Sequence, residues 1–482
     1  MSAKRQLFLW HRYLGITLCL FLVMWFASGM VLMYVHYPSL SGEHRLAGLP
    51  ALPSGQDLLA PSQVVDDHAA IDALRLTSVT GKPTYHVLRD DTWQNIDAVT
   101  GVRTAPDNQA LRKAAERHGD APVASLQQVR VDQWTVTSDY DPHRPLVRAV
   151  MDDEAGTYLY LSSRTGEVVQ AATHHERTWN WVGAVLHWIY PWQLRQYPSL
   201  WSNVVIILCI PALALIITGT IVGLQRLRLR RRYKHNRVTP YRGIQRWHHL
   251  LGITCTVFVT SFMFSGLMSM NPGGIFSYPS PGASMAARWA DGPLIPDATA
   301  SPSDLLTAGS DVREIVWQRH AGTPLALVRG PSGRSVHTAA GARPDLGRDE
   351  LVKRADAVID DGKPVDVTRL TRHSHYYYDR HDPPPLPVLR IRMDDPAATT
   401  LYINPDDARI EARFERSTRW RRWLYNGLHS LDFPFLWGNR PLWDVVMLTL
   451  CTLGLLFSLT GVVIGWRRLS MGGGRSRRGR RA

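Results

Sequence analysis

Long apolar runs alternate with polar segments along the chain. The four longest cover residues 7–34, 201–224, 244–270 and 442–466. Each is at least as long as the ~20 residues that a helix needs to cross the hydrocarbon layer of a bilayer. The pattern therefore predicts a membrane protein with four transmembrane helices.

The polar segments at 35–175 and 271–415 contain the clearest strand signals. Strand-like runs lie at Arg148–Asp153 and Thr157–Leu161 in the first segment, and at Val388–Met393 and Thr400–Ile403 in the second. Turn-forming residues separate and close these runs, so each pair predicts a β-hairpin. Helical stretches are expected near residues 62–74, 109–117 and 348–359. Each segment is therefore predicted to form a small α+β domain.

A passage rich in Trp and Tyr follows each predicted domain, at residues 176–200 and 416–441. These side chains gather at membrane surfaces because their rings are apolar but carry a polar edge. Both passages are therefore predicted to be amphipathic segments that lie along the outer membrane interface and contact lipid.

The second half of the chain repeats the first. The run Trp10–Ile16 returns as Trp247–Ile253, and each copy opens an apolar run. Further on, matching residues are 242 positions apart: Asp152 and Asp394, Tyr160 and Tyr402, His187 and His429, Cys209 and Cys451, Thr218-Gly219 and Thr460-Gly461. We therefore predict an internal duplication in which each half consists of a span, a domain, an amphipathic passage and a second span.

The net charge of +14 is concentrated beside the predicted spans. Residues 4–12, 225–242 and 467–482 hold 18 Lys and Arg without any acidic residue, which leaves 37 basic and 41 acidic residues elsewhere. By the positive-inside rule, both termini, the loop 225–243 and the tail 467–482 are cytoplasmic, and the two domains are periplasmic. The charge therefore indicates a multi-pass protein of a bacterial inner membrane and no nucleic-acid partner, although an Arg-rich nucleic-acid contact is an alternative for the tail.

Two histidines occupy matching places near the cytoplasmic ends of the first and third spans. His11 and His248 are each followed one helical turn later by a glycine, Gly15 and Gly252. A flat macrocycle ligated by histidine needs a neighbour without a side chain. The alternative is an interfacial histidine beside a glycine that serves helix packing. Further small residues recur, Ser28-Gly29 with Ser265-Gly266 and Gly219 and Gly223 with Gly461 and Gly465, and they allow close approach either of helices or of a porphyrin.

A second matched pair, His187 and His429, is expected at the opposite membrane face. Neutral imidazole is a standard axial ligand of haem iron, so two pairs at two depths predict two haems. The chain has no C-x-x-C-H motif, which makes any haem b-type. We predict that His11 pairs with His248 and that His187 pairs with His429.

Other histidines are candidates for the same or different roles. His249 adjoins His248, and His36 lies at the outer end of the first span, so each is a substitute ligand. In the second domain, His373, His375 and Tyr376 form a candidate contact for a metal or an iron chelate. In a strand, His373 and His375 would face one side. The alternative is that the neighbouring tyrosines belong to a buried strand face.

With the repeated W-H-x-x-L-G-I spans, the two hairpins and the interfacial histidines, the chain resembles the PepSY-associated transmembrane family. It looks most like that family's inner-membrane ferric-siderophore reductases, and His11, His187, His248 and His429 stand where the family's helix-associated histidines stand. The resemblance implies b-type haem between four helices and an enzyme that reduces a periplasmic iron chelate. Ser138-Asp139-Tyr140 stands roughly where the second domain has its His-Tyr cluster, so the domains differ.

The source of electrons is expected outside this chain, because no G-x-G-x-x-G or P-loop pattern is present. The basic cytoplasmic segments could dock an acidic donor, for which a flavoprotein is one candidate, or bind lipid headgroups. Two other functions remain open: a non-catalytic membrane protein whose domains bind peptides or proteins, and a quinone-linked haem oxidoreductase.

Overall fold

The computed structural model describes residues 2–65, 71–294, 299–306, 311–344, 346–379 and 382–478. The chain divides into two compact units. The first comprises residues 1–37, 178–276 and 420–482, and the second comprises residues 38–177 and 277–419. Each unit therefore collects segments from both halves of the chain.

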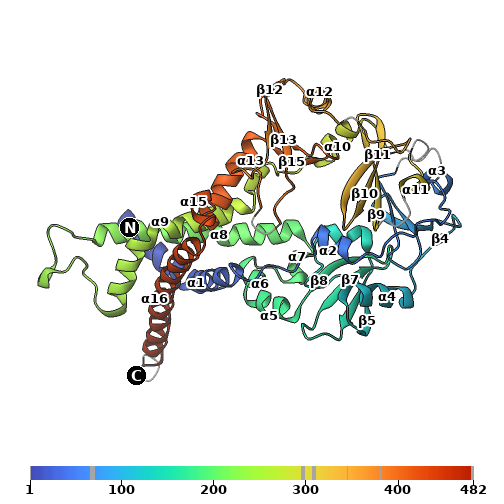
Figure 1. Ribbon diagram of the computed structural model, residues 1–482. Coiled ribbons are helices and arrows are strands. Elements are labelled where there is room, and N and C mark those ends of the chain that lie inside the picture. Colours follow the sequence, from blue (N-terminus) through green and yellow to red (C-terminus); the bar gives the residue numbers. More distant parts are fainter. Residues whose placement is uncertain are drawn as a thin grey trace. The chain divides into compact units, whose positions relative to one another are not determined.

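The first unit is built on four long helices, shown in Figure 1: α1 (Ala3–Leu32), α8 (Pro198–Arg226), α9 (Gly243–Ser269) and α16 (Leu442–Arg478). All four are long and apolar enough to cross a membrane, with α16 meeting this criterion over Leu442–Ser470. The four predicted spans are thereby confirmed as helices, and the protein is a multi-pass membrane protein.

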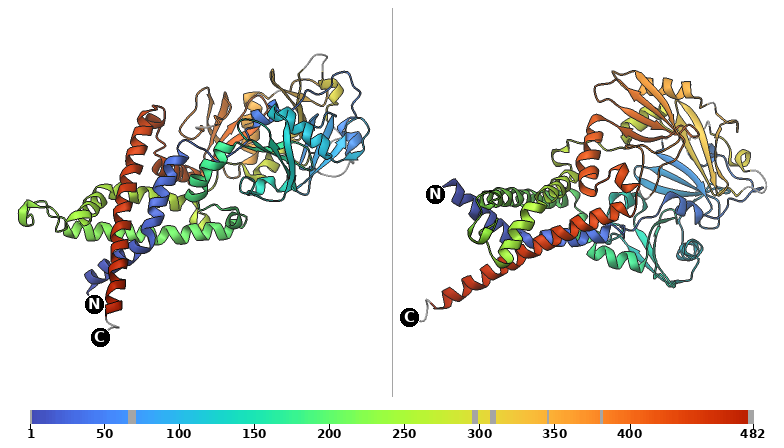
Figure 2. Two further views of the ribbon diagram at one scale, coloured as in Figure 1. Left: turned by 90° about the horizontal axis from the view of Figure 1, so that it is seen from below. Right: turned by 60° about the vertical axis from the view of Figure 1, so that its left-hand side comes forward.

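The helices form a closed ring in which each has two neighbours. Helix α1 packs against α8 and α16, and α9 packs against the same two helices; α1 and α16 lie side by side in both views of Figure 2. The shared core includes Leu18, Leu22, Phe26, Leu215, Val259 and Met263. Three of the four cysteines join this core, and all four are buried and free.

Short helices precede α8 and α16. Before α8 come α5 (His174–Val182), α6 (Ala184–His187) and α7 (Trp192–Arg195). Before α16 come α13 (Arg416–Arg421), a π-helical turn at Arg422–Gly427, α14 (Leu428–Ser430) and α15 (Pro434–Trp437). Exposed aromatic side chains project from these segments, among them Trp179, Trp181, Trp420 and Phe435.

The second unit contains two four-stranded antiparallel sheets with the same strand order. One consists of β5 (Val123–Val129), β6 (Leu146–Met151), β7 (Tyr158–Ser162) and β8 (Val168–Ala172); the other consists of β12 (Pro364–Leu370), β13 (Val388–Met393), β14 (Thr400–Ile403) and β15 (Ile410–Phe414). Both predicted hairpins are confirmed, because Val147 pairs with Leu161 and Leu389 pairs with Ile403.

The helices predicted at 109–117 and 348–359 are confirmed as α4 (Asn108–Gly119) and α12 (Arg348–Val358). Each packs on one of the two sheets through buried side chains such as Leu111 and Leu351. The helix predicted at 62–74 is wrong. Only the single turn α3 (Pro61–Val64) forms there, residues 66–70 lie outside the described residues, and Ala73 already belongs to a strand.

A third sheet contains strands from both polar segments. Its order is β11 (Gly333–Thr338), β10 (Thr323–Gly330), β9 (Glu314–His320), β1 (Ala73–Thr77), β2 (Thr84–Arg89), β3 (Thr92–Asp97) and β4 (Arg103–Thr104). Strands β1 and β9 pair antiparallel, with Leu76 opposite Ile315. The two polar segments are therefore not independent domains as the sequence suggested. Their central strands share one sheet and one hydrophobic core.

The remaining short elements connect these layers. They are α2 (Gly42–Ala47), η1 (Ser138–His143), η2 (Lys234–Asn236), η3 (Pro272–Gly274), α10 (Gly282–Ala290) and α11 (Pro302–Leu305). Among them, η1 ends directly before Arg144, whose side chain bonds Asp141 of this short helix.

Candidate functional site

One pair of histidines lies inside the helical bundle near the start of α1. His11 on α1 and His248 on α9 have ring centroids 6.3 Å apart. His11 packs against the last third of α8, at Leu215 and Gly219, and His248 packs against α16, at Phe457, Thr460 and Gly461. All four helices therefore meet at this level.

The second pair lies at the other end of the same helices. His187, the last residue of α6, and His429 in α14 have ring centroids 6.0 Å apart. His187 packs on Ser28 and Gly29 of α1, and His429 packs on Ser265 and Gly266 of α9. The structure thus brings together the two pairs that the sequence predicted, each drawn from both halves of the chain.

In every ring, Nδ1 faces a hydrogen-bond acceptor. His187 Nδ1 lies 3.1 Å from Ser28 Oγ and 3.1 Å from the Trp25 carbonyl oxygen. His429 Nδ1 lies 3.0 Å from Ser265 Oγ and 3.2 Å from the Phe262 carbonyl oxygen. His248 Nδ1 lies 2.8 Å from Thr460 Oγ1, and His11 Nδ1 lies 3.2 Å from the Leu215 carbonyl oxygen.

These contacts assign one tautomer to all four histidines. The Ser28 hydroxyl donates to the Met24 carbonyl at 2.6 Å and the Thr460 hydroxyl donates to the Phe457 carbonyl at 2.5 Å, so their oxygens are left to accept from the rings. Nδ1 then carries the proton and Nε2 carries the lone pair. Histidines that ligate metals are held in this way, with the other ring N–H donated to a fixed acceptor.

Glycines make room for the rings, and they are the recurring small residues that the sequence showed to allow close approach of helices or a porphyrin. A Cβ on Gly219 would lie 2.6 Å from Cε1 of His11, and a Cβ on Gly29 would lie 3.2 Å from Cε1 of His187. Gly461 and Gly266 face His248 and His429 at 3.6 and 3.5 Å.

The glycines one turn after His11 and His248 meet other side chains. A Cβ on Gly15 would contact Leu215 at 3.6 Å, and a Cβ on Gly252 would contact Phe457 at 3.0 Å. These neighbours, Leu215 and Phe457, are also neighbours of His11 and His248, so each glycine lies on the same helix face as its histidine. That the two glycines border a macrocycle stays a prediction.

The geometry of both pairs fits an iron porphyrin held from its two faces. A ring that ligates iron through Nε2 has its centroid about 3.2 Å from the metal, so two such rings on opposite sides of one iron have centroids about 6.4 Å apart. The observed separations of 6.3 and 6.0 Å are close to this distance. Within the described part of the chain, Nε2 of these four rings forms no hydrogen bond.

A metal held by protein side chains alone would need more donors than two. Among the described residues, no group of three or more His, Cys, Asp or Glu side chains is placed to hold a metal ion. Two imidazoles are sufficient for haem, because the porphyrin supplies the other four nitrogens. The two levels are well separated, since 18 positions divide His11 from Gly29 on α1, or about 27 Å of helix at ~1.5 Å per residue.

The substitute ligands differ in their surroundings. Both ring nitrogens of buried His249 are engaged: Nδ1 lies 2.8 Å from Thr239 Oγ1 and Nε2 lies 2.8 Å from the Gly223 carbonyl oxygen. His249 therefore ties the loop after α8 to α9 and has no lone pair directed at a cofactor. The His36 backbone carbonyl accepts a hydrogen bond from Asn180 at 2.8 Å.

The candidate metal cluster of the second domain does not form a strand. Residues 371–379 are bends and irregular backbone, so the alternation expected of His373 and His375 does not apply. His373 Nε2 donates to the Pro384 carbonyl at 2.9 Å, and Tyr377 is buried with its ring stacked on Tyr402 at 4.8 Å. Tyr376 packs on Phe414 at 5.6 Å. Tyr376 and Tyr377 thus belong to a small aromatic core, as the alternative interpretation expected of buried tyrosines, but they do not lie on a strand.

Sequence reasoning missed the residues that orient the rings. Ser28 and Ser265 appeared in the sequence only as small residues that allow close approach of helices or a porphyrin, and Thr460 appeared only as the repeat match of Thr218. Their hydroxyl groups contact histidines more than 150 positions away along the chain, and no local pattern links residues at that separation.

The fold and the paired histidines define a polytopic membrane protein whose helical core is built around two histidine pairs. The model of one family, the PepSY-associated TM region, matches residues 8–328, about two thirds of the chain. The chain belongs to this family, as its sequence resemblance predicted. Among curated proteins, none matches the chain.

Proposed function

We propose that the protein is a di-haem b reductase of the inner membrane. It accepts electrons from a cytoplasmic donor and passes them to a ferric chelate in the periplasm, where Fe(III) gains one electron and is released as Fe(II). The observation that carries the proposal is the presence of two histidine pairs, with ring centroids 6.3 and 6.0 Å apart and with Nδ1 of each ring held by a hydrogen-bond acceptor.

Each part of the chain has a distinct role in this proposal. His11 with His248, and His187 with His429, hold one haem at each level, and the bound haems supply reversible one-electron Fe(III)/Fe(II) chemistry. The hydroxyl and carbonyl acceptors keep the rings oriented and the tautomer fixed. Gly219, Gly461, Gly29 and Gly266 leave the space in which each ring sits.

Orientation in the membrane follows from charge and from the duplication that we infer for the chain. Placing the basic segments 225–242 and 467–482 in the cytoplasm puts the His11–His248 level near the cytoplasm and the His187–His429 level near the periplasm. The two levels then lie near the two faces of the ~30 Å hydrocarbon layer, so that one haem would exchange electrons with the cytoplasmic side and the other with the periplasmic side. The two halves contribute one ligand each to both levels, as a duplicated unit would.

The proposal is tested with the full chain in proteoliposomes that enclose a soluble reductant and face a ferric chelate with an Fe(II)-specific dye outside. We expect Fe(II) to form outside the vesicles only when both histidine pairs are intact, so His11→Ala and His187→Ala should each abolish the dye signal. The matched control is His249→Gln, which changes a neighbouring buried histidine that has no free ring nitrogen. Equal Fe(II) formation in all four proteins, or none in any, would contradict the proposal.

A further inference from the structure

Two adjoining hollows open on the first polar segment of the second unit. One, of about 370 Å³, lies where β3 and β4 approach the turn between β7 and β8, and its lining includes Trp93, Asn95, Arg103, Ser163 and Arg164. The other, of about 530 Å³, is lined by Gln128, Arg130, Arg144 and Pro145. Pro145 borders both hollows, which are therefore adjacent, and together they are called the depression below.

The charge of this depression is opposite to that of its surroundings. Residues 38–177 carry 13 Lys and Arg against 19 Asp and Glu, an acidic excess. The lining nevertheless contains four arginines and no carboxylate. Walls of one charge sign concentrate field lines in a concave site and attract ligands of the opposite sign. The depression is therefore suited to an anion.

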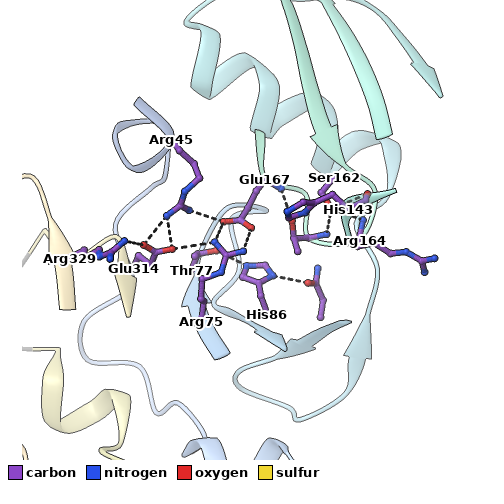
Figure 3. A network of polar contacts seen from close by, with 12 residues as sticks. Arg45, Arg75, Thr77, His86, His143, Ser162, Arg164, Glu167, Glu314 and Arg329 are labelled. Carbon is purple, nitrogen blue, oxygen red and sulfur yellow. Dashed lines mark hydrogen bonds and ion pairs between the residues drawn. The ribbon is translucent and has the colours of Figure 1, made fainter. Parts of the chain in front are cut away.

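Most of these arginines are available to a ligand. Arg144 is committed to the fold, since it bonds Asp141 at 2.7 Å and the carbonyls of Thr135 and Thr137. Arg103, Arg130 and Arg164 form no ion pair within the described ranges of the chain. Arg164 Nε donates to the Arg144 carbonyl at 3.2 Å, which fixes the base of its guanidinium while the rest of the side chain points away from the buried network (Figure 3).

The wall behind the smaller hollow is rigid. Arg75 lies 4.5 Å from the Trp93 ring and bonds buried Glu167 through both oxygens, at 3.0 and 2.7 Å. Arg45 bridges Glu167 and Glu314 from the other side (Figure 3). The wall continues at His86, where Nδ1 lies 2.7 Å from Asn95 Oδ1 and Nε2 lies 2.8 Å from Thr77 Oγ1. A wall that is ordered before binding lowers the entropic cost of holding a ligand.

The matching place in the second polar segment has different chemistry. Asp406 stands 242 positions after Arg164, and Arg334 lies 3.8 Å from Asp406 and 3.4 Å from buried Asp407. An arginine that is free in the first copy is thus replaced by an acidic residue that is already paired. At this position the two segments therefore differ in charge, which favours a ligand-binding role for Arg164 over a general requirement of the fold.

We propose that this depression binds a small anion with several carboxylates, with Arg103 and Arg164 as its principal contacts. A guanidinium presents its N–H groups in a planar fork that matches the two oxygens of a carboxylate, and a volume of several hundred Å³ is typical of small-molecule sites. Identifying this anion with the ferric chelate that is reduced rests on the proposed function. Binding itself requires no electron transfer.

The test measures binding of gallium(III) citrate, which cannot be reduced, to the full-length protein in detergent by calorimetry. We expect binding that weakens as salt is raised, because exposed charges are screened. Loss of a charge-assisted hydrogen bond should weaken binding about tenfold in Arg103→Gln, and more in Arg164→Asp, which introduces the residue type of the second copy. Arg164→Lys should restore part of the affinity, and the control Arg392→Gln, at an exposed arginine on β13, should bind as the unmodified protein does.

Several results would overturn the proposal: no binding at millimolar citrate complex, equal binding by all variants, or equally tight binding of inorganic phosphate, which would indicate a general anion site. Haem content is measured on the same samples. Because the depression is separate from the histidine pairs, haem content should be unchanged in the arginine variants, and His187→Ala should still bind gallium citrate. If the protein contains no haem but still binds the citrate complex, the proposed function is refuted and the proposed anion site stands.

Discussion

Replacing Gly219 by Ala should reduce haem at the His11–His248 level, whereas the same change at Gly461 should not. These glycines occupy matching places on α8 and α16, but their distances to the ring differ. A Cβ at position 219 would lie 2.6 Å from Cε1 and 2.9 Å from Nδ1 of His11, while a Cβ at position 461 would lie 3.6 Å from Cε1 of His248. Both distances from position 219 are shorter than van der Waals contact, whereas the distance from position 461 is an ordinary contact.

The size of the effect follows from the displacement that the new methyl group requires. Moving Cε1 of His11 from 2.6 Å to an ordinary contact needs a shift of almost 1 Å, which also lengthens the 3.2 Å contact between Nδ1 and the Leu215 carbonyl. Overpacking of this kind costs about 1–3 kcal/mol, which corresponds to roughly a five- to 150-fold loss of haem affinity.

Haem titration of the purified protein, read by absorbance and by the pyridine haemochrome method, measures this difference. We expect Gly219→Ala to retain haem at the His187–His429 level and to lose it at the other level on dilution, and Gly461→Ala to match the unmodified protein. Equal haem affinity in the two variants would refute the steric argument, as would a preferential loss of haem in Gly461→Ala.

Three further predictions concern the partners of buried polar groups. Thr460→Val removes the hydroxyl that accepts a hydrogen bond from His248 and should weaken haem binding about 10–100-fold. Thr460→Ser keeps the hydroxyl and should bind haem normally; equal haem retention by the two variants would contradict this role. Glu167→Gln should destabilise the second unit by about 3–5 kcal/mol, which amide hydrogen exchange should show as faster exchange in β1 and β8. The control Glu154→Gln changes an exposed residue and should leave the exchange rates unchanged. Burial lowers the pKa of His143 to about 4. The unfolded chain, with a His pKa near ~6.5, is protonated first, so the stability of this region should fall as pH drops from 6.5 to 4, and His143→Asn should remove part of the slope.

The Glu167 prediction depends on why a buried carboxylate stays charged. Burial by itself would raise the pKa of Glu167, but the neighbouring Arg75, His86 and Arg45 outweigh it and hold the pKa well below its usual range. A carboxylate of this kind stabilises the fold fully above the unfolded pKa of ~4.3, and the contribution is lost as pH falls below that value. In Glu167→Gln, acid should therefore cause a smaller loss of stability than in the unmodified protein.

The elements that the sequence predicted well are those determined by local pattern. Hydropathy alone indicates the spans that become α1, α8, α9 and α16, because the bilayer sets their length and apolar character. Alternation and turn residues indicate the β6–β7 and β13–β14 hairpins, whose strands are adjacent in the chain. The repeat likewise indicated which histidines would match.

Features that depend on tertiary neighbours were not predictable from the sequence. The pairing of β1 with β9 joins residues about 240 positions apart, and nothing in either strand specifies its partner. The glycines beside the rings lie on neighbouring helices, so the repeat marked Gly219 as a small residue without showing that it faces His11. The ion pair between Arg45 and buried Glu314 could not be predicted for the same reason, since charge patterning does not reveal which charged residues pair in the folded protein.

The most direct test of the central claim is the haem stoichiometry of the purified full-length protein, combined with its low-temperature electron paramagnetic resonance spectrum. The account predicts two haems b per chain, both low-spin with two imidazole ligands. His11→Ala and His187→Ala should each retain about one haem, and His249→Gln should retain two. A protein without haem, or one whose haem content is the same in all three variants, would contradict the account.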